Sequence, residues 1–240
     1  MKFLAVIQAR MGSTRLPGKV MMPLGGRLAI DHVVERAQKI PGVNHTVVAT
    51  STRPIDDALA QHCATALGVE VYRGSESDVL DRYYQAAVGH NPEAVVRITA
   101  DCPLLDPRES GKVLAAFAAT SQCDYASNVE VRRYPIGLDT EVVAMAALAM
   151  MWKTAVDAYD REHVTEFIVR QPGRFRTASV LADTDLGAQR WTLDRPDDYE
   201  FLAGIFAALG QAGKFGYLGE VLDLLRSNPG LARRDQPATH

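Results

Sequence analysis

The chain has 240 residues, 47% of them hydrophobic, and a formal net charge of −3. That length can bury a substantial core, and so small a charge argues against a general binder of nucleic acid or membrane surfaces. Cys63, Cys102 and Cys123 lack CxxC spacing, so we expect reduced thiols rather than a zinc site. Because we find neither a signal peptide nor a run of about 20 apolar residues, we expect a cytoplasmic protein that makes no membrane contact.

Short β-branched runs alternate with longer amphipathic segments in the first hundred residues. Because each predicted strand is followed by a helix, we predict the α/β class, with an open, mostly parallel twisted sheet flanked by helices. The strands are expected at Phe3–Ile7, Thr46–Ala49, Glu70–Tyr72 and Val95–Thr99, and the helices at Leu28–Ile40, Ile55–Leu67 and Val79–Val88.

This regular order loosens after residue 101. The segment "VEVRRYPIGLDTEVVAM" (129–145) contains Pro135 and Gly137, which favours a hairpin or an excursion from the main sheet. We therefore predict one domain, 1–227, with an inserted hairpin and helix element at about 124–180 and a mobile tail at 228–240. Further elements are expected at Glu109–Ala119, Asp124–Ser127, Ala146–Ala158, Glu162–Val169, Asp197–Leu209 and Leu218–Leu225.

The loop after the first strand, "QARMGSTRLPGK" (8–19), combines glycines, hydroxyls and cations. It is not a P-loop, because five residues separate Gly12 from Gly18 and Val20 follows Lys19 where that motif needs Ser or Thr. It also lacks the glycine spacing of a dinucleotide-binding fingerprint. A solvated basic loop paired with surface carboxylates is the plain alternative.

A triphosphate site explains the composition of this loop better than solvation does. Open α/β sheets bind ligands at the carboxyl ends of their strands. Gly12 would allow close backbone approach, and the Ser13 and Thr14 hydroxyls could donate hydrogen bonds. Arg15 could grip phosphate oxygens with its planar fork, while Lys19 supplies a compact charge.

Several motifs in the same order resemble one family, the cytidylyltransferases that make CMP-activated acidic sugars, and most closely its spore coat polysaccharide biosynthesis branch. The resemblance covers roughly residues 3 to 205 and implies the nucleotide-diphospho-sugar transferase fold. It rests on "QARMGSTRLPGKVMMPLGG", "VYRGSESDVLDRYYQAA", "VVRITADCPLLDP", "YPIGLDTEV", "REHVT" and "RWTLDRPDDYEF".

The resemblance implies that Asp101 and Asp194 bind a catalytic Mg²⁺ ion, because aspartates stand at these two motif positions in the family. Asp101 directly follows a predicted strand, as a ligand at the carboxyl edge should. Each aspartate has a structural alternative: Asp101 as the cap of a helix after Pro103, and Asp194 as the cap of a helix that Pro196 begins.

Other roles also follow from the resemblance. It places Ala9, Arg10 and Arg73 on the nucleotide side, although Arg73 could equally be a surface residue. It also implies a homodimer built on the inserted element. The acceptor side is expected to include Asp139, Glu141, Arg161 and His163, although alternate acidic residues on an edge strand and a histidine at a helix start are often structural.

The implied reaction is an in-line attack by a hydroxyl of a sugar or sugar-like acid on the α-phosphorus of CTP, with release of pyrophosphate. Arg15, Lys19, Asp101 and Asp194 would carry it by positioning and charge neutralisation. Two alternatives remain open: a glycosyltransferase, although its usual DxD pair is missing at Asp101, and a non-catalytic nucleotide-binding protein. The segment "TADCPLL" matches neither the keto-deoxy-octulosonate nor the sialic acid synthetases closely, so the acceptor also stays open.

Overall fold

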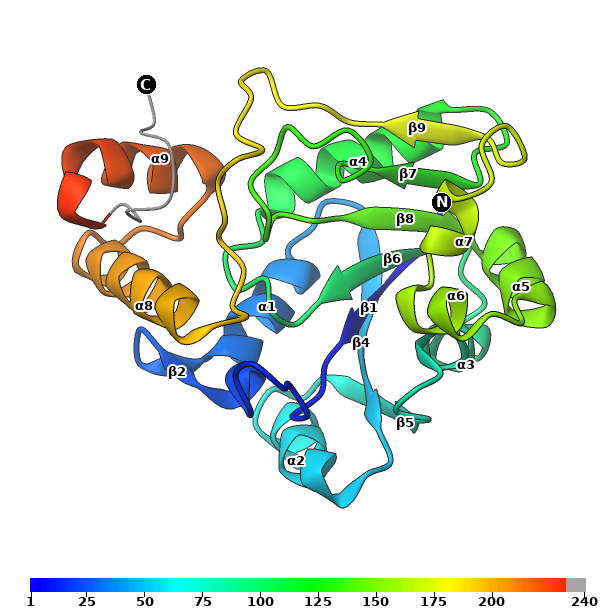
Figure 1. The fold of residues 1–240 in the computed structure, drawn as a ribbon, viewed down its shortest axis with the longest axis horizontal. Helices are drawn as coiled ribbons and strands as arrows, with labels where there is room; N and C mark the ends of the chain where they lie inside the picture. The colour runs from blue at the N-terminus through cyan, green and yellow to red at the C-terminus, as the bar shows by residue number, and fades with distance from the viewer. Residues whose placement is uncertain (232–240) are drawn as a thin grey trace.

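A seven-stranded sheet organises the computed structural model, which describes residues 1–231 (Figure 1). The strands follow the order β5-β4-β1-β6-β8-β7-β9, and β2 pairs with β3 in a separate small ribbon. The α/β class and the mostly parallel sheet are confirmed. The strand bounds are β1 Phe3–Gln8, β2 Pro23–Leu24, β3 Arg27–Leu28, β4 Val43–Ser51, β5 Glu70–Gly74, β6 Ala94–Thr99, β7 Tyr125–Ser127, β8 Glu141–Ala144 and β9 Thr177–Ser179.

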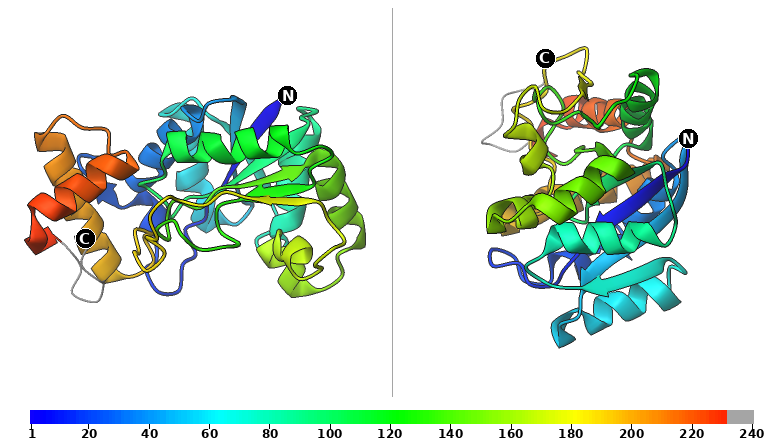
Figure 2. Two further views of the ribbon diagram at one scale, coloured as in Figure 1. Left: turned by 90° about the horizontal axis from the view of Figure 1, so that it is seen from above. Right: turned by 90° about the vertical axis from the view of Figure 1, so that its right-hand side faces the viewer.

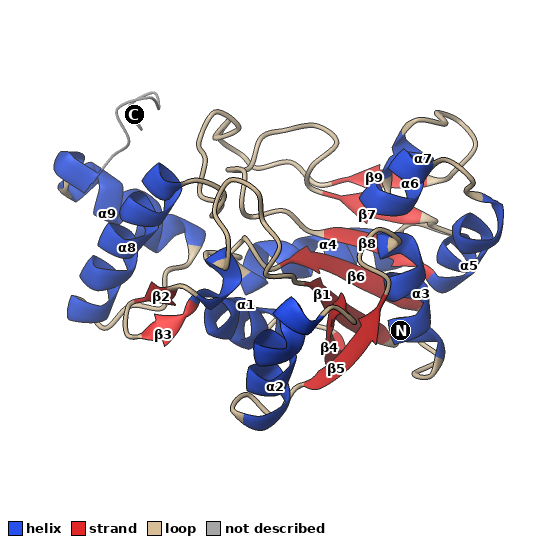
Figure 3. Ribbon diagram, turned by 60° about the horizontal axis from the view of Figure 1, so that its bottom comes forward, coloured by secondary structure: helices blue, strands red, loops and turns tan. Residues whose placement is uncertain are grey.

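Helices flank this sheet and connect its strands (Figure 3). The predicted helix over 79–88 has those bounds, and most other predicted helices differ from the observed ones by one to four residues at an end. The bounds are α1 Ala29–Gln38, α2 Asp57–Thr65, α3 Val79–Val88, α4 Pro107–Ala119, α5 Met145–Thr154, α6 Ala158–His163, α7 Glu166–Val169, α8 Pro196–Gln211 and α9 Leu218–Ser227, with 3₁₀ turns at Lys19–Met21, Pro54–Asp56 and Pro229–Leu231.

Strand β1 shows why the sheet is buried on both faces. Phe3, Ala5 and Ile7 point into one hydrophobic cluster, and the alternate residues Leu4 and Val6 point into another. Helices α1, α2 and α4 cover the first face, whereas α3, α5 and α7 cover the second. Figure 2 shows α4 and the α5–α7 group on opposite sides of the sheet.

A third cluster lies beside the sheet, where α8 packs against α9 and the β2–β3 ribbon. Its centre is Trp191, which is fully buried and comes from the extended segment before α8. Burial of this cluster attaches the carboxyl-terminal helices to the β2–β3 ribbon, which follows the loop after β1.

The segment predicted as a hairpin or excursion pairs antiparallel with β7, as a hairpin does, but its strand β8 belongs to the main sheet. Strand β8 lies between β6 and β7 and is antiparallel to both, which makes it the one reversed strand in this sheet over residues 1–231. Pro135 and Gly137 correctly indicated a turn, but Val142 and Val143 are buried and belong to the interior strand that follows it.

The single helix predicted over 162–169 is also wrong. It is divided into α6 and α7 at Val164, whose φ of +55° is strained for a β-branched residue. The predicted tail falls mostly on residues 232–240, outside the described part of the chain. Within residues 1–231, none of the helices combines the length and apolar character needed to cross a membrane.

Candidate active site

The loop after β1 folds back on itself at the carboxyl edge of the sheet. The backbone N–H of Met11 donates to Asp56 Oδ1 at 2.7 Å, and the carbonyl of Met11 accepts the N–H of Gly18 at 3.0 Å. Gly18 has a φ of +72°, a conformation that glycine adopts without a steric penalty. The loop therefore returns to its starting point, and Lys19 begins the 3₁₀ turn directly beside the end of β1.

Two long-range hydrogen bonds to one backbone carbonyl bring the predicted metal ligands together. Asp101 follows β6, and its carbonyl oxygen accepts the N–H of Leu193 at 2.8 Å and the hydroxyl of Thr192 at 3.1 Å. The extended segment before α8 is thereby joined to the end of β6. This pairing carries Asp194 to the same edge as Asp101, although the two are 93 positions apart in sequence.

Neither aspartate caps a helix. Helix α4 is capped by Asp106, whose side chain accepts the N–H of Arg108. At the start of α8 the cap residue is Arg195, and the Asp198 carboxylate accepts the N–H groups of Asp194 and Arg195 at 2.8 and 2.9 Å. The capping alternatives for Asp101 and Asp194 are therefore wrong, and both carboxylates are free of a role in capping.

Lys19 lies between the two carboxylates. Its Nζ is 2.8 Å from Asp101 Oδ2 and 2.8 Å from Asp194 Oδ1. Burial lowers the pKa of Lys19, but the charges and hydrogen bonds of the two aspartates outweigh it and the pKa ends above its usual value. The ammonium group of Lys19 therefore contacts both carboxylates, so a positive charge lies between Asp101 and Asp194.

Asp194 also contacts two arginines. Arg190 Nη2 donates to Asp194 Oδ2 at 2.7 Å and also pairs with the buried Asp198, while Arg15 Nη2 lies 3.4 Å from Asp194 Oδ1. Burial raises the pKa of Asp194, but Lys19 and Arg190 together lower it by a larger amount, so the pKa ends below its usual value. The carboxylate is therefore ionised at neutral pH.

These groups line a cavity of about 360 Å³, which we call the nucleotide cavity. Two further features were not predicted: Glu162 faces Arg10 at 4.0 Å, and the side-chain oxygen of Gln8 has no hydrogen-bond partner among the described residues. The predicted residues that line the cavity are Ala9, Arg10, Gly12, Ser13, Thr14, Arg15, Lys19, Asp101 and Asp194, together with His163.

Arg73 does not line the nucleotide cavity. Its guanidinium donates to the carbonyl of Ser51 at 2.9 Å and to Asp57 Oδ1 at 2.6 Å, near the start of α2. These contacts fit the surface alternative.

A second cavity of about 180 Å³, the acceptor cavity, adjoins the first and shares Thr99 and His163 with it. Asp139 and Glu141 line it, as does Arg132, which pairs with Asp139. Burial raises the pKa of Asp139 more than Arg132 lowers it, so the pKa ends above its usual value. Both acidic and basic side chains therefore line the acceptor cavity.

Two of the predicted acceptor residues have structural partners. Arg161 Nε donates to Asp78 Oδ2 at 2.7 Å and Nη1 donates to the carbonyl of Ala155 at 3.0 Å, so its guanidinium is outside both cavities. Glu141 lines the acceptor cavity but is buried and already binds Arg97 and the hydroxyl of Tyr125.

Cys102, next to Asp101, is a buried thiol. Burial raises the pKa of its thiol well above the usual value, and Asp101 raises it further. The thiol is therefore protonated at neutral pH, a form in which it is a weak nucleophile.

Sequence reasoning also missed three arginines in segments that it had singled out. Arg190 in "RWTLD" positions Asp194, Arg97 in "VVRIT" pairs with the buried Glu141, and Arg132 lies in the acceptor cavity. An arginine within such a motif indicates a nearby carboxylate or carbonyl group, because a guanidinium that is removed from solvent requires such partners.

The comparisons with known proteins point in one direction. The sequence pattern of the family described as Cytidylyltransferase matches residues 4–208. The chain is 34% identical to the spore coat polysaccharide biosynthesis protein SpsF of Bacillus subtilis, over 95% of the chain and 96% of that protein. It is 39% identical to a 3-deoxy-manno-octulosonate cytidylyltransferase of Anaeromyxobacter dehalogenans, over 85% of the chain and 97% of that protein.

A solved structure has the same fold over its full length. It is a cytidylyltransferase from Leptospira borgpetersenii, 29% identical, with a TM-score of 0.91 over 100% of both chains. The resemblance to this family and the fold that it implies are both confirmed.

Proposed function

Because the chain belongs to the cytidylyltransferase family, we propose that it transfers CMP from CTP to a hydroxyl of a sugar or sugar-like acid. A bond forms between the acceptor oxygen and the α-phosphorus, and the bond from the α-phosphorus to the pyrophosphate oxygen breaks. The acceptor proton is released, and pyrophosphate leaves. The product would supply the assembly of a surface polysaccharide or another glycan, as the name of the Bacillus subtilis relative suggests.

The contact of Lys19 with both aspartates is the observation that carries this proposal. It joins the cationic loop after β1 to Asp101, which follows β6, and to Asp194, which precedes α8, within one cavity. In the proposed complex, the loop amides, the Ser13 and Thr14 hydroxyls and Arg15 bind the triphosphate. Lys19 then follows the negative charge that builds up on the departing phosphates.

The donor set suits Mg²⁺, which binds proteins through one or two carboxylates and completes its shell with phosphate oxygens and water. Asp101 Oδ2 and Asp194 Oδ1 each lie 2.8 Å from the same nitrogen, so they are at most twice that distance apart. The ammonium of Lys19 stands in for a cation at this position. When bound, the metal would neutralise charge on the phosphates during transfer.

The acceptor cavity is where we place the second substrate. Thr99 and His163 line both cavities, so an acceptor hydroxyl placed there can approach the nucleotide. Asp139 can accept hydrogen bonds from sugar hydroxyls, and the Arg132 guanidinium can bind an acidic group of the acceptor. Arg161 then acts as a positioning residue that holds α6 against α3 through Asp78.

The predicted homodimer remains part of the proposal. Val131, Val156, Tyr159 and Val169 are exposed apolar side chains within the segment 124–180, where we expect the contact between two copies. The mass in solution, measured by light scattering after gel filtration, tests this expectation. A monomer at all concentrations would refute it.

Pyrophosphate release tests the proposed reaction. The protein is mixed with Mg²⁺, each of the four nucleoside triphosphates in turn, and a panel of acidic sugars. We expect turnover with CTP and one class of acidic sugar, and none after chelation of the metal. Binding of CTP without turnover on any acceptor would favour the non-catalytic alternative, and hydrolysis or transfer of a nucleotide-sugar would favour a glycosyltransferase.

A further inference from the structure

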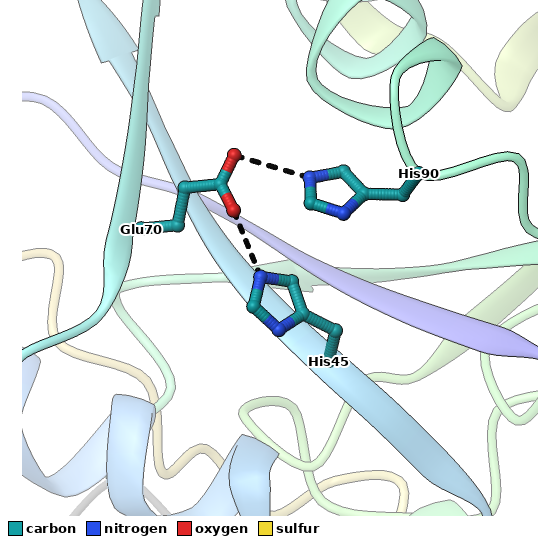
Figure 4. Close-up of side chains that lie close together, drawn as sticks. All are labelled: His45, Glu70 and His90. Carbon is teal, nitrogen blue, oxygen red and sulfur yellow. Dashed lines mark hydrogen bonds and ion pairs between the residues drawn. The ribbon is translucent and has the colours of Figure 1, made fainter.

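A cluster of two histidines and one glutamate lies at the amino edge of the sheet, at the opposite end of the parallel strands from both cavities (Figure 4). His45 Nε2 is 2.9 Å from Glu70 Oε2, and His90 Nε2 is 3.1 Å from Glu70 Oε1. Both imidazoles direct Nε2 at the same carboxylate, and their rings lie 4.8 Å apart between centroids.

The fold brings these three side chains together from three separate segments. His45 is near the start of β4 and Glu70 begins β5, and the two strands pair in parallel with Val47 opposite Glu70. Since residues two apart point to the same face of a strand, His45 and Glu70 share the face that α3 covers. His90 follows the end of α3 and completes the cluster.

The backbone around His90 is fixed. Its carbonyl accepts a hydrogen bond from the Lys2 side chain, and the carbonyl of Lys2 accepts the N–H of Glu93 at 2.9 Å. The imidazole is therefore held beside the sheet rather than on a free loop. The side chains of His45 and Glu70 remain 46% and 49% exposed, so an ion has open access from solvent.

Two imidazoles and a carboxylate are a ligand set that borderline divalent metals prefer, whereas Mg²⁺ prefers oxygen alone. The candidate ligand atoms of the three residues all lie within 4.8 Å of one another. A tetrahedral Zn²⁺ site with bonds of about 2.0–2.1 Å places its ligand atoms about 3.3 Å apart. Small side-chain rotations would bring the three atoms to that separation and leave one position for water.

We propose that His45, Glu70 and His90 form a Zn²⁺ site that is separate from the nucleotide and acceptor cavities. A bound ion would replace the two imidazole–carboxylate hydrogen bonds and would join β4, β5 and the connection between α3 and β6. Because only the folded chain brings the three ligands together, binding would stabilise the folded state by mass action.

Equilibrium dialysis of the untagged protein against Zn²⁺, in excess Mg²⁺ to occupy carboxylate sites, tests the proposal. We expect His45→Gln and His90→Gln each to bind one equivalent of Zn²⁺ fewer than the unaltered protein. His62→Gln is the matched control, because His62 also pairs with a carboxylate, Asp31, at 2.7 Å but belongs to no group of three candidate metal ligands among residues 1–231. This control should bind as much Zn²⁺ as the unaltered protein.

Thermal unfolding gives a second readout. At a hundredfold excess of Zn²⁺ over its Kd, the unaltered protein should unfold roughly 5–10 °C higher, and His90→Gln should show no such shift. Equal zinc binding by the unaltered protein and both cluster variants would overturn the proposal. Pyrophosphate release with CTP and Mg²⁺ should be unchanged in His90→Gln, so this proposal and the proposed reaction fail independently.

Discussion

Two charged clusters near the carboxyl edge of the sheet differ in how their charges are compensated. In the nucleotide cavity, Lys19 is shared between Asp101 and Asp194, and the cluster faces a cavity of about 360 Å³. Beside it, Arg97 pairs with Glu141, and that carboxylate also accepts the Tyr125 hydroxyl at 2.7 Å. The Glu141 side chain is only 7% exposed, whereas the Asp101 and Asp194 side chains are 27% and 15% exposed.

The difference separates a cluster that can rearrange from one that cannot. A carboxylate beside a solvent-filled cavity can exchange its ammonium partner for a metal or a substrate, because water compensates the charges during the exchange. The Arg97–Glu141 pair is less accessible because Glu141 is buried, and removal of either partner leaves the other charge unpaired in a poorly solvated site. We therefore expect substitutions in the first cluster to lower activity and those in the second to lower stability.

The largest expected effect is on turnover. Asp194→Asn or Asp101→Asn removes a negative charge from the proposed metal site and should lower kcat by on the order of a hundredfold or more, or about 3 kcal/mol of barrier. Pyrophosphate release measures this loss, and urea unfolding should show little change in stability. Asp223→Asn, an exposed aspartate on α9, is the control and should keep full activity.

Stability should fall most when the buried pair is broken. Glu141→Gln keeps the size of the side chain but leaves the Arg97 charge unpaired, so the free energy of unfolding should drop by about 3 kcal/mol. Denaturant unfolding measures this change. A loss below about 1 kcal/mol would remove the contrast between the two clusters, because Arg97 would then have another way to compensate its charge.

Lys19→Met should affect activity more than stability. Asp194 keeps its contact with Arg190 at 2.7 Å, so the fold retains a partner for that carboxylate. We expect kcat/KM for CTP to fall by about a hundredfold or less, since one phosphate-binding cation is lost. Arg27→Met is a useful comparison, because Arg27 pairs with Glu35 outside the cavity and should leave kcat/KM unchanged.

The smallest effect belongs to an exposed ion pair. Hydrogen bonds from Lys39 and Arg27 lower the pKa of Glu35 from 4.5 to about 2. Because the pKa is lower in the folded state, this contribution to stability is present above pH 4.5 and is lost as the pH falls towards 2. Glu35→Gln should cost less than about 1 kcal/mol at pH 7 and progressively less as the pH falls through 2, measured by unfolding at each pH.

The sequence predicted most of the strands, several helices and the loop residues of the nucleotide cavity because these features depend on local patterns. The alternation in β1 and the glycines and cations after it needed no knowledge of distant residues. The nearness of Asp101 and Asp194 came from the family resemblance. Its physical cause, the hydrogen bond from Leu193 to the Asp101 carbonyl, joins segments that no local pattern connects.

Long-range pairing also explains the errors. Strand β8 was expected in a hairpin or an excursion, and its place between β6 and β7 was missed because that place is set by partners rather than by its own four residues. The break at Val164 was missed because the helical periodicity of the sequence continues through this residue, whereas its backbone conformation is not helical. The guanidinium groups of Arg73 and Arg161 face partners outside both cavities, and a motif alone does not show the direction of a side chain.

The most direct test of the central claim needs no acceptor. Titration calorimetry would measure CTP binding to the unaltered protein and to the Asp101→Asn, Asp194→Asn double variant, with and without Mn²⁺ as the divalent ion. We predict that Mn²⁺ tightens CTP binding to the unaltered protein and has no effect on the variant. The same tightening in both proteins would contradict the claim that these two carboxylates hold the metal.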